Sequence, residues 1–148
     1  MARIKIDLPD KFPFSVPISI RITDINYGGH VGNDTVLSLI HEARVQFLQY
    51  HGYKELEIEG IGLIMSDAGI EFKVELFYGD IIRVSVCPAD FSRVGFNLYY
   101  KIEKEIEGKK IMVAAAKTGM ICYNYSLKKI VTIPEKLKAT LSGQTKIE

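Results

Sequence analysis

The sequence has little excess charge, few cysteines and no grouping of metal-ligating residues. Nineteen basic residues stand against eighteen acidic ones. No basic block is present, so the electrostatic footprint of a nucleic-acid-binding protein is missing. The two cysteines, Cys87 and Cys122, are expected to be buried small hydrophobic residues rather than a disulfide or a site. The three histidines lack companions at zinc-site spacing, so we expect no metal and no cofactor.

No segment approaches the roughly 18 apolar residues of a membrane span, and the N-terminus lacks the continuous apolar region of a signal peptide. We therefore expect a cytoplasmic protein with no membrane partner. With 47% hydrophobic residues, the chain suffices for one compact domain, which we assign to residues 1–148. Because three of the five prolines lie in residues 9–17, residues 1–16 are expected to be an extended segment. Residues 142–148 are expected to be a flexible tail.

The polar chemistry of the chain is concentrated between residues 23 and 34. A strand is expected at 18–23, followed by a glycine-rich turn with one histidine. A helix is then expected from Asn33 to His51, ended by Gly52, because glycine suits the left-handed conformation that follows a helix. Strand, turn and helix N-terminus meet here, so backbone amides and polar side chains are predicted to converge on one point.

The expected helix is amphipathic and long enough to cover one face of a sheet. Its apolar stripe has helical spacing and consists of Val36, Leu39, Ile40, Ala43, Phe47 and Tyr50. After the helix, the apolar period changes to the alternation typical of strands. Four strand-like regions follow, joined by short turns: 61–78, 82–87, 94–102 and 111–125. A short helix is expected to open at Ile133-Pro134-Glu135.

This order of elements predicts an α+β domain in which an antiparallel sheet curls around one central helix. Such a sheet has free edges, which favour pairing with a second copy of the chain. We therefore expect a homodimer.

One pattern of residues spans the turn and the helix: Arg21-x-x-Asp24-x-Asn26-x-x-x-His30-Val31-x-Asn33, followed by Glu42-Ala43-Arg44. It resembles the hotdog-fold acyl-CoA thioesterases of the 4-hydroxybenzoyl-CoA thioesterase type. The resemblance covers roughly residues 17–138. It implies the hotdog fold, a long central helix wrapped by a curved antiparallel sheet of about five or six strands. It also implies homodimers, or homotetramers built from such dimers.

The resemblance further implies hydrolysis of an acyl-CoA or acyl-carrier thioester to the free acid and a thiol. The thioester carbonyl would lie at the N-terminus of the central helix, where backbone amides and the helix dipole stabilise an oxyanion. The amides of this turn are the candidate donors, and the substrate-binding residues expected here are Gly29, Val31, Gly32 and Asn33. For the CoA phosphates, the candidate contact is Arg93.

The main departure from the family pattern is Asn26. Related thioesterases usually carry a carboxylate at this position, which acts as base or nucleophile. An amide cannot accept a proton at neutral pH, but Asn26 can still orient a water molecule or donate to the carbonyl. The catalytic base is therefore expected elsewhere.

Four further residues are candidates for the catalytic group. Asp24 is either the base or a side chain that caps its own turn, and His30 either positions water or bonds to nearby backbone. Asp34 is a first-turn carboxylate that could act as base, while Asn33 and Asp34 also suit the start of a helix. Glu42 lies opposite the apolar stripe and is expected to pair with Arg44 or a neighbouring chain. The alternative is that Glu42 is itself the catalytic group.

Two alternatives to thioester hydrolysis remain open. A non-catalytic acyl-CoA binding or sensor protein would explain the missing acid at Asn26. A hotdog enoyl-thioester hydratase or dehydratase would use a carboxylate and histidine pair, for which Asp24 and His30 are superficially compatible. Release of free thiol distinguishes hydrolysis from both.

Overall fold

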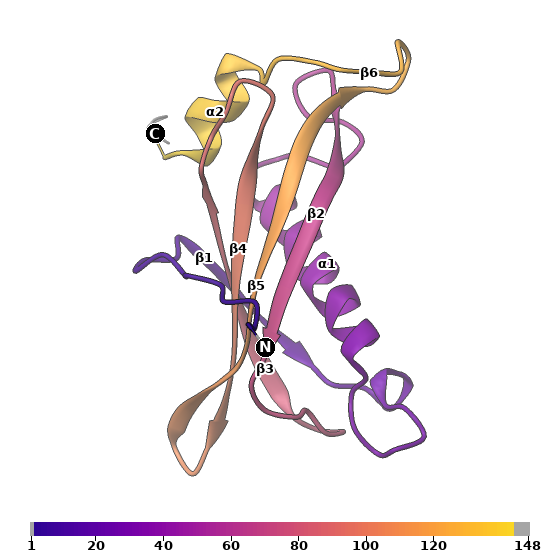
Figure 1. The fold of residues 1–148 in the computed structure, drawn as a ribbon, viewed down its shortest axis with the longest axis vertical. Coiled ribbons are helices and arrows are strands. Elements are labelled where there is room, and N and C mark those ends of the chain that lie inside the picture. The colour runs from indigo at the N-terminus through magenta and orange to yellow at the C-terminus, as the bar shows by residue number, and fades with distance from the viewer. Residues whose placement is uncertain (1, 144–148) are drawn as a thin grey trace.

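The computed structural model describes residues 2–143, so most of the predicted tail at 142–148 lies outside the described residues. Figure 1 shows the elements, which follow one another as β1 (Phe14–Ser19), the 3-10 helix η1 (Ile22–Asp24), α1 (Asn33–Tyr50), β2 (Gly62–Phe72), β3 (Ile81–Ala89), β4 (Gly95–Ile106), β5 (Lys109–Asn124), β6 (Lys129–Ile130) and α2 (Glu135–Leu141). Within residues 2–143, neither α-helix combines the length and apolar character that a membrane crossing requires.

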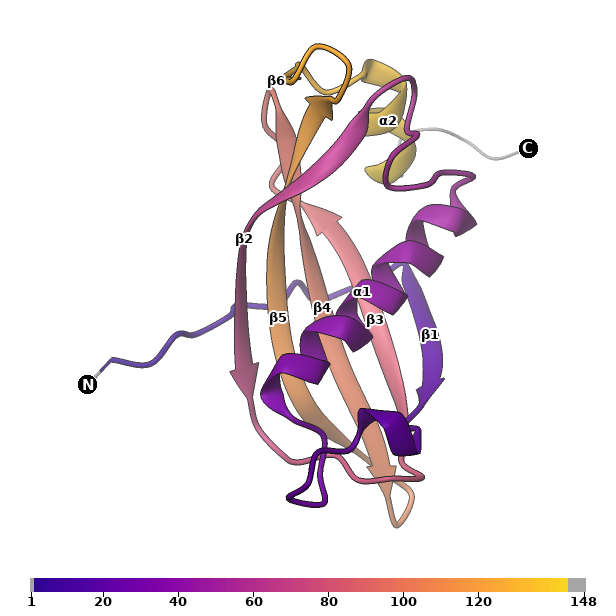
Figure 2. The same cartoon turned by 90° about the vertical axis from the view of Figure 1, so that its right-hand side faces the viewer.

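The strands form one antiparallel sheet in the order β1-β3-β4-β5-β2, with β6 paired to the end of β5. On the central strand β4, Tyr100 lies between Val86 of β3 and Ala116 of β5. The sheet curves around α1, which crosses its concave face (Figure 2). The predicted α+β architecture, a long helix wrapped by a curved antiparallel sheet of five or six strands, is confirmed.

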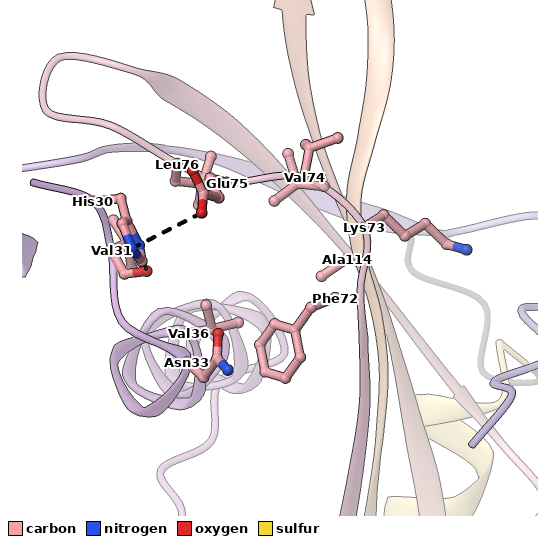
Figure 3. Close-up of a pocket in the computed structure, with 11 residues that line it drawn as sticks. His30, Val31, Asn33, Val36, Phe72, Lys73, Val74, Glu75, Leu76 and Ala114 are labelled. Atoms are coloured by element: carbon pink, nitrogen blue, oxygen red, sulfur yellow. Dashed lines mark hydrogen bonds and ion pairs between the residues drawn. The ribbon is translucent and has the colours of Figure 1, made fainter. Parts of the chain in front are cut away.

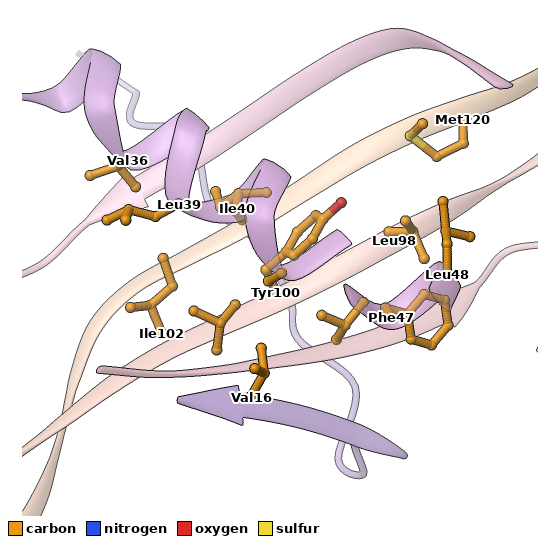
Figure 4. Close-up of a cluster of buried hydrophobic side chains, with 14 of the residues drawn as sticks. Val16, Val36, Leu39, Ile40, Phe47, Leu48, Leu98, Tyr100, Ile102 and Met120 are labelled. Atoms are coloured by element: carbon orange, nitrogen blue, oxygen red, sulfur yellow. The ribbon is translucent and has the colours of Figure 1, made fainter. Parts of the chain in front are cut away.

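The core lies between α1 and the sheet, and the predicted apolar stripe supplies most of its helical half. Ile40 and Phe47 are at most 1% exposed. They face Leu98, Tyr100 and Ile102 of β4, which alternate with outward-facing residues as a half-buried strand requires (Figure 4). Burial of these large side chains is the main stabilising term of the fold.

The C-terminal end of the stripe differs from the prediction. Tyr50 is 64% exposed, whereas Leu48 is fully buried. Tyr50 is the last residue of α1, and its ring lies 5.5 Å from that of Phe14 on β1. Because the sheet curves around the helix, it covers a wider arc of helix surface than one stripe. The helix ends as predicted before Gly52, whose φ is +83°.

The first strand begins earlier than predicted, at Phe14 rather than at residue 18. The prolines of this region suggested an extended entry segment without helix, with the strand starting only after Pro17; instead β1 includes Pro17 as an edge strand that pairs with β3 among the described residues. An edge strand tolerates Pro17, because its missing N–H need not serve a second neighbour. The predicted strand end at 22–23 is instead η1, where the Asp24 carboxylate accepts a hydrogen bond from the Arg21 amide at 2.8 Å.

The connection from β2 to β3, residues 73–80, brings a distant part of the sequence to the start of α1. These two strands are not neighbours in the sheet, so the connection crosses its end. The Val31 amide donates to the Leu76 carbonyl at 2.9 Å, and the Lys73 amide donates to the Val113 carbonyl at 2.9 Å. Leu76 is 2% exposed. The connection is therefore anchored directly beneath the N-terminus of α1.

A buried polar chain joins the middle of α1 to the sheet. Arg44 is 7% exposed. It donates to the Glu55 carboxylate at 3.2 Å and to the Tyr100 hydroxyl at 3.3 Å, and Tyr100 bonds Thr118 at 2.8 Å. Burial raises the pKa of the Tyr100 hydroxyl, although Arg44 and Thr118 act in the opposite direction. Arg44 thus pairs with Glu55, and its predicted pairing with Glu42 is wrong.

Candidate functional site

The turn before α1 is held by the side chain and the backbone of Asn26. Its Oδ1 accepts the Gly28 amide at 2.8 Å, its carbonyl accepts the Gly29 amide at 3.1 Å, and its amide donates to the His30 carbonyl at 3.0 Å. Asparagine favours such turns because its short side chain bonds the backbone two residues on. Gly29 has φ +86°, which a glycine adopts without strain.

The N-terminus of α1 carries no side-chain cap. The N-cap residue is Gly32, and no side chain bonds the first turn, although Asn33 and Asp34 suit this position by residue type. The first amides of a helix have no partner within it. In an 18-residue helix they also stand at the positive end of the dipole. The start of α1 is therefore a ready donor site for an anionic oxygen.

Two of the predicted amide donors are already engaged. The Gly29 amide donates to Asn26 and the Val31 amide donates to Leu76. Among the described residues, the His30 amide has no acceptor. The donors that remain are the amides of His30 and Gly32 and the first-turn amides of Asn33 and Asp34.

A pocket of about 240 Å³ opens beside this helix end (Figure 3). One wall is the turn and first helical residues, and the other is the end of β2 with the following connection. It is lined by His30, Val31, Asn33, Val36, Phe72, Lys73, Val74, Glu75, Leu76, Val113 and Ala114. Seven of these eleven residues are apolar and four are polar or charged, as in sites that bind small organic molecules.

His30 and Glu75 lie next to each other on one side of the pocket, as Figure 3 shows. The Nε2 atom of His30 lies 3.9 Å from Oε1 of Glu75. The other ring nitrogen, Nδ1, lies 3.1 Å from the Val31 carbonyl. Since a carbonyl only accepts, Nδ1 carries the proton in this contact. Lys73 points away from the pocket and lies 3.7 Å from Glu71.

Three of the predicted catalytic side chains meet around the glycines of the turn. A methyl group built on Gly28 would lie 3.2 Å from Oδ1 of Asn26 and 3.7 Å from Nε2 of His30. A methyl group on Gly32 would lie 2.6 Å from Oδ1 of Asp34 and 3.4 Å from Nδ2 of Asn26. Asn26 thus lies between His30 and Asp34 at the start of the helix.

The other three predicted site residues lie elsewhere in the chain. Asp24 is 7% exposed, and its carboxylate is held by the Arg21 amide and by the Arg21 guanidinium at 3.5 Å. Glu42 lies on the outer side of α1, where Gln46 donates to it at 2.8 Å. Arg93 follows β3 at the end of the sheet where α2 lies, opposite to the start of α1 (Figure 1).

Glu75 was not predicted from the sequence. It belongs to region 61–78, which reads as a strand, and nothing in that pattern distinguishes it from a solvent-facing carboxylate. Only the crossing of residues 73–80 beneath α1 brings it to His30. The one available signal was a carboxylate between two apolar residues, Val74 and Leu76, which is too common to indicate a site. Within residues 2–143, no three side chains are grouped as a metal site would need.

Comparison with known proteins gives one consistent result. The model of the family described as the thioesterase-like superfamily matches residues 20–141. A 1,4-dihydroxy-2-naphthoyl-CoA hydrolase from Microcystis aeruginosa is 31% identical over 132 residues, which cover 87% of this chain and 93% of that protein.

Solved structures agree with this match. A hypothetical protein from Aquifex aeolicus superimposes with a TM-score of 0.77 and 27% identity, over 87% of this chain and 99% of that one. A mutant of 4-hydroxybenzoyl CoA thioesterase, complexed with 4-hydroxybenzoyl CoA, superimposes with a TM-score of 0.79 over 86% and 97% of the two chains. Its identity is 15%, so it shows the fold alone, and the hotdog fold predicted from the sequence is confirmed.

Proposed function

Since the chain belongs to the thioesterase-like superfamily, we propose that it hydrolyses an acyl-CoA thioester to the free acid and CoA. The observation that carries this proposal is the uncapped N-terminus of α1, which opens beside a largely apolar pocket. A thioester carbonyl placed there develops its negative charge at the positive end of the helix, where preorganised amides stabilise the tetrahedral intermediate.

In this scheme the acyl group occupies the apolar part of the pocket and the carbonyl oxygen accepts from the amides of His30 and Asn33. Asn26 holds the turn through its Oδ1 and its backbone, and the hydrogens of its Nδ2 can donate to the carbonyl or to the attacking water. Water attacks the carbonyl carbon, and the tetrahedral intermediate then expels the CoA thiol. The reaction needs no cofactor, because water and a proton acceptor suffice for hydrolysis.

We expect the acyl group to be small or medium in size. The pocket measures about 240 Å³, slightly below the roughly 300 Å³ at which pockets for drug-sized ligands begin. Phe72 and Leu76 offer it apolar surface. The Microcystis relative acts on an aromatic acyl-CoA by its name, so aromatic esters belong in the first panel. An acyl carrier protein remains the alternative carrier.

We also propose that the chain forms a homodimer, and that two such dimers can pair into a homotetramer. Strand β2 is an 11-residue edge strand that pairs only with β5 among the described residues. At the start of the strand, the Leu63 amide donates to the Glu55 carbonyl at 2.9 Å. Beyond Leu63, the outer backbone groups of β2 have no backbone partner among the described residues, and Met65 is 48% exposed. Long edge strands of this kind are normally covered. A second β2 in antiparallel orientation would continue the sheet.

Hydration of an enoyl thioester is the second candidate. The observation in its favour is that a histidine and a carboxylate, His30 and Glu75, share one pocket at 3.9 Å. Hydration leaves the thioester bond intact, whereas hydrolysis releases a thiol. A sensor would bind the ester and leave both its thioester bond and its carbon–carbon double bond unchanged.

The test is thiol release from aromatic, short-chain and medium-chain acyl-CoAs, followed with a thiol reagent. Wild type is compared with Asn26→Ala, Asp34→Asn and Glu42→Gln. We expect turnover by wild type and loss of activity in Asn26→Ala, because the Asn26 side chain holds the turn that presents the His30 amide. We expect little change in Asp34→Asn and Glu42→Gln, because neither side chain lines the pocket. Saturable binding by calorimetry without thiol release from any ester would contradict the proposal and leave a sensor.

A further inference from the structure

We propose that Glu75 is a catalytic residue of this site, and that Glu75 and His30 together hold the attacking water and take its proton. This inference rests on the proposed thioester hydrolysis and identifies the acceptor that Asn26 cannot provide. It comes from the contact between two segments that are far apart in the sequence.

The backbone around Glu75 is fixed on both sides. The Val74 amide donates to the Val113 carbonyl at 3.2 Å, and the Leu76 carbonyl accepts from Val31 at 2.9 Å. The Lys104 ammonium donates to the Glu75 carbonyl at 2.9 Å. Glu75 therefore projects from an anchored segment of backbone, which is the condition for a reproducible catalytic geometry. Its side chain is 63% exposed, so water reaches it freely.

His30 is oriented by its own neighbour. Because Nδ1 donates to the Val31 carbonyl at 3.1 Å, the neutral ring presents the lone pair of Nε2 to the pocket. A carboxylate oxygen and this nitrogen are both acceptors, and they lie 3.9 Å apart. One water at about 2.8 Å from each atom can donate a hydrogen to both. Its oxygen lone pairs then point away from the two acceptors and towards the bound carbonyl.

The proton balance of the step is complete. The water oxygen forms a bond to the thioester carbon, the carbonyl pair moves onto oxygen, and one water proton passes to Nε2 of His30. Glu75 accepts the second hydrogen bond and stabilises the imidazolium beside it. When the carbonyl re-forms, the carbon–sulfur bond breaks, and the proton on His30 passes to the departing thiolate. The products are the acid and the thiol, and both residues return to their initial state.

The other carboxylates fit this role less well. Asp24 is buried and bonded to Arg21, and Glu42 bonds Gln46 on the far side of α1. Asp34 lies near Asn26 but is not part of the pocket lining. Glu75 is the carboxylate of the lining.

The experiment measures kcat and KM separately for Glu75→Gln, Glu75→Asp and His30→Gln on an ester that wild type hydrolyses. Positioned proton acceptors contribute on the order of 100-fold or more. We therefore expect kcat to fall about 100-fold in Glu75→Gln and His30→Gln with little change in KM, and Glu75→Asp to retain part of the rate. The matched control is Glu57→Gln, an exposed carboxylate in the loop after α1, which we expect to match wild type.

Circular dichroism and thermal unfolding of each variant verify that it is folded. If folded Glu75→Gln keeps wild-type kcat, the assignment of Glu75 is overturned while thioester hydrolysis stands. If wild type releases no thiol from any ester, the proposed function itself fails. In that case, a second measurement follows the absorbance of an enoyl-CoA to test whether His30 and Glu75 catalyse hydration. Hydration by wild type that is lost in Glu75→Gln supports a catalytic Glu75. No hydration by wild type overturns the assignment.

Discussion

At the scale of single residues, Asn26 organises the turn before α1. Its Oδ1 accepts the Gly28 amide, and an amide oxygen cannot take a proton at neutral pH, whereas its Nδ2 hydrogens can donate to a ligand. In the proposed hydrolysis, Asn26 therefore shapes the turn and the proton acceptor is another residue. The same geometry is open to aspartate, because a carboxylate oxygen accepts the same bond.

We predict that Asn26→Asp keeps the turn and raises kcat/KM for thioester hydrolysis by about tenfold, because it adds a proton acceptor beside the helix N-terminus. Asn26→Ala, the matched control, loses the acceptor of the Gly28 amide and is expected to lower the free energy of unfolding by about 1 kcal/mol. Thiol-release kinetics and urea unfolding measure the two effects. A decrease of activity in a stable Asn26→Asp would show that a negative charge at this point repels the oxyanion.

At the scale of elements, the close approach of β4 and β5 depends on a glycine. A methyl group on Gly95 would lie 2.1 Å from the Met120 carbonyl oxygen and 3.1 Å from its carbon. Both atoms belong to backbone within the sheet, so they cannot move as the end of a side chain can. Gly95 is thus required where β4 begins.

We predict that Gly95→Ala lowers the free energy of unfolding by about 2 kcal/mol, in the range of overpacked sites. Gly69→Ala is the control, because a methyl group there meets only the ends of flexible side chains, the nearest being Cδ1 of Ile6 at 3.3 Å. Chemical denaturation of both variants tests this. Equal free energies of unfolding for the two variants would contradict the prediction, because they would mean that β4 and β5 accommodate the added methyl group without loss of stability.

The end of α1 carries a titratable ring whose burial couples stability to pH. The His51 ring packs edge-on against the rings of Phe47 and Tyr50, with 5.0 Å between ring centroids in each case, and burial lowers its pKa from 6.5. Because the pKa is lower in the folded state, the stabilisation that comes from packing the neutral His51 ring is fully present above the pKa of the unfolded chain. It is lost as the pH falls through the pKa of the folded chain.

We predict that the free energy of unfolding of wild type decreases more between about pH 8 and pH 5 than that of His51→Phe, which keeps a ring but does not titrate. Urea unfolding across this range measures the difference. His41→Phe is the comparison, since it removes a histidine of α1 that bonds the Glu55 carboxylate at 2.6 Å instead of packing against aromatic rings. Parallel pH curves for wild type and His51→Phe would refute the coupling.

At the scale of the whole molecule, the edge strand β2 is the surface on which the proposed dimer rests. The sheet order leaves β1 and β2 at its two edges. β1 contains Pro17 and is short, with six residues, whereas β2 is longer and contains no proline. Proline and short length both discourage further pairing, so the edge open to a second copy is β2.

We predict that wild type sediments as a dimer or a dimer of dimers, and that Ala68→Lys weakens the dimer at least tenfold, because a lysine on an edge strand opposes pairing. Leu127→Lys is the control, because Leu127 is also exposed but lies outside β2, and this variant should remain associated. Analytical ultracentrifugation over a range of concentrations measures both. A monomeric wild type would refute the proposal.

The sequence by itself predicted the long helix from Asn33, the later antiparallel strands and the convergence of Asn26, His30 and Asp34, because local periodicity and turn chemistry encode these features. It misplaced β1, since an edge strand tolerates prolines that local rules treat as breaks. The Arg44–Glu55 pair and the pocket residue Glu75 were decided only by the tertiary structure. Both depend on contacts between segments far apart in the chain, which the order of strands in the sheet brings together, and no local pattern records that order.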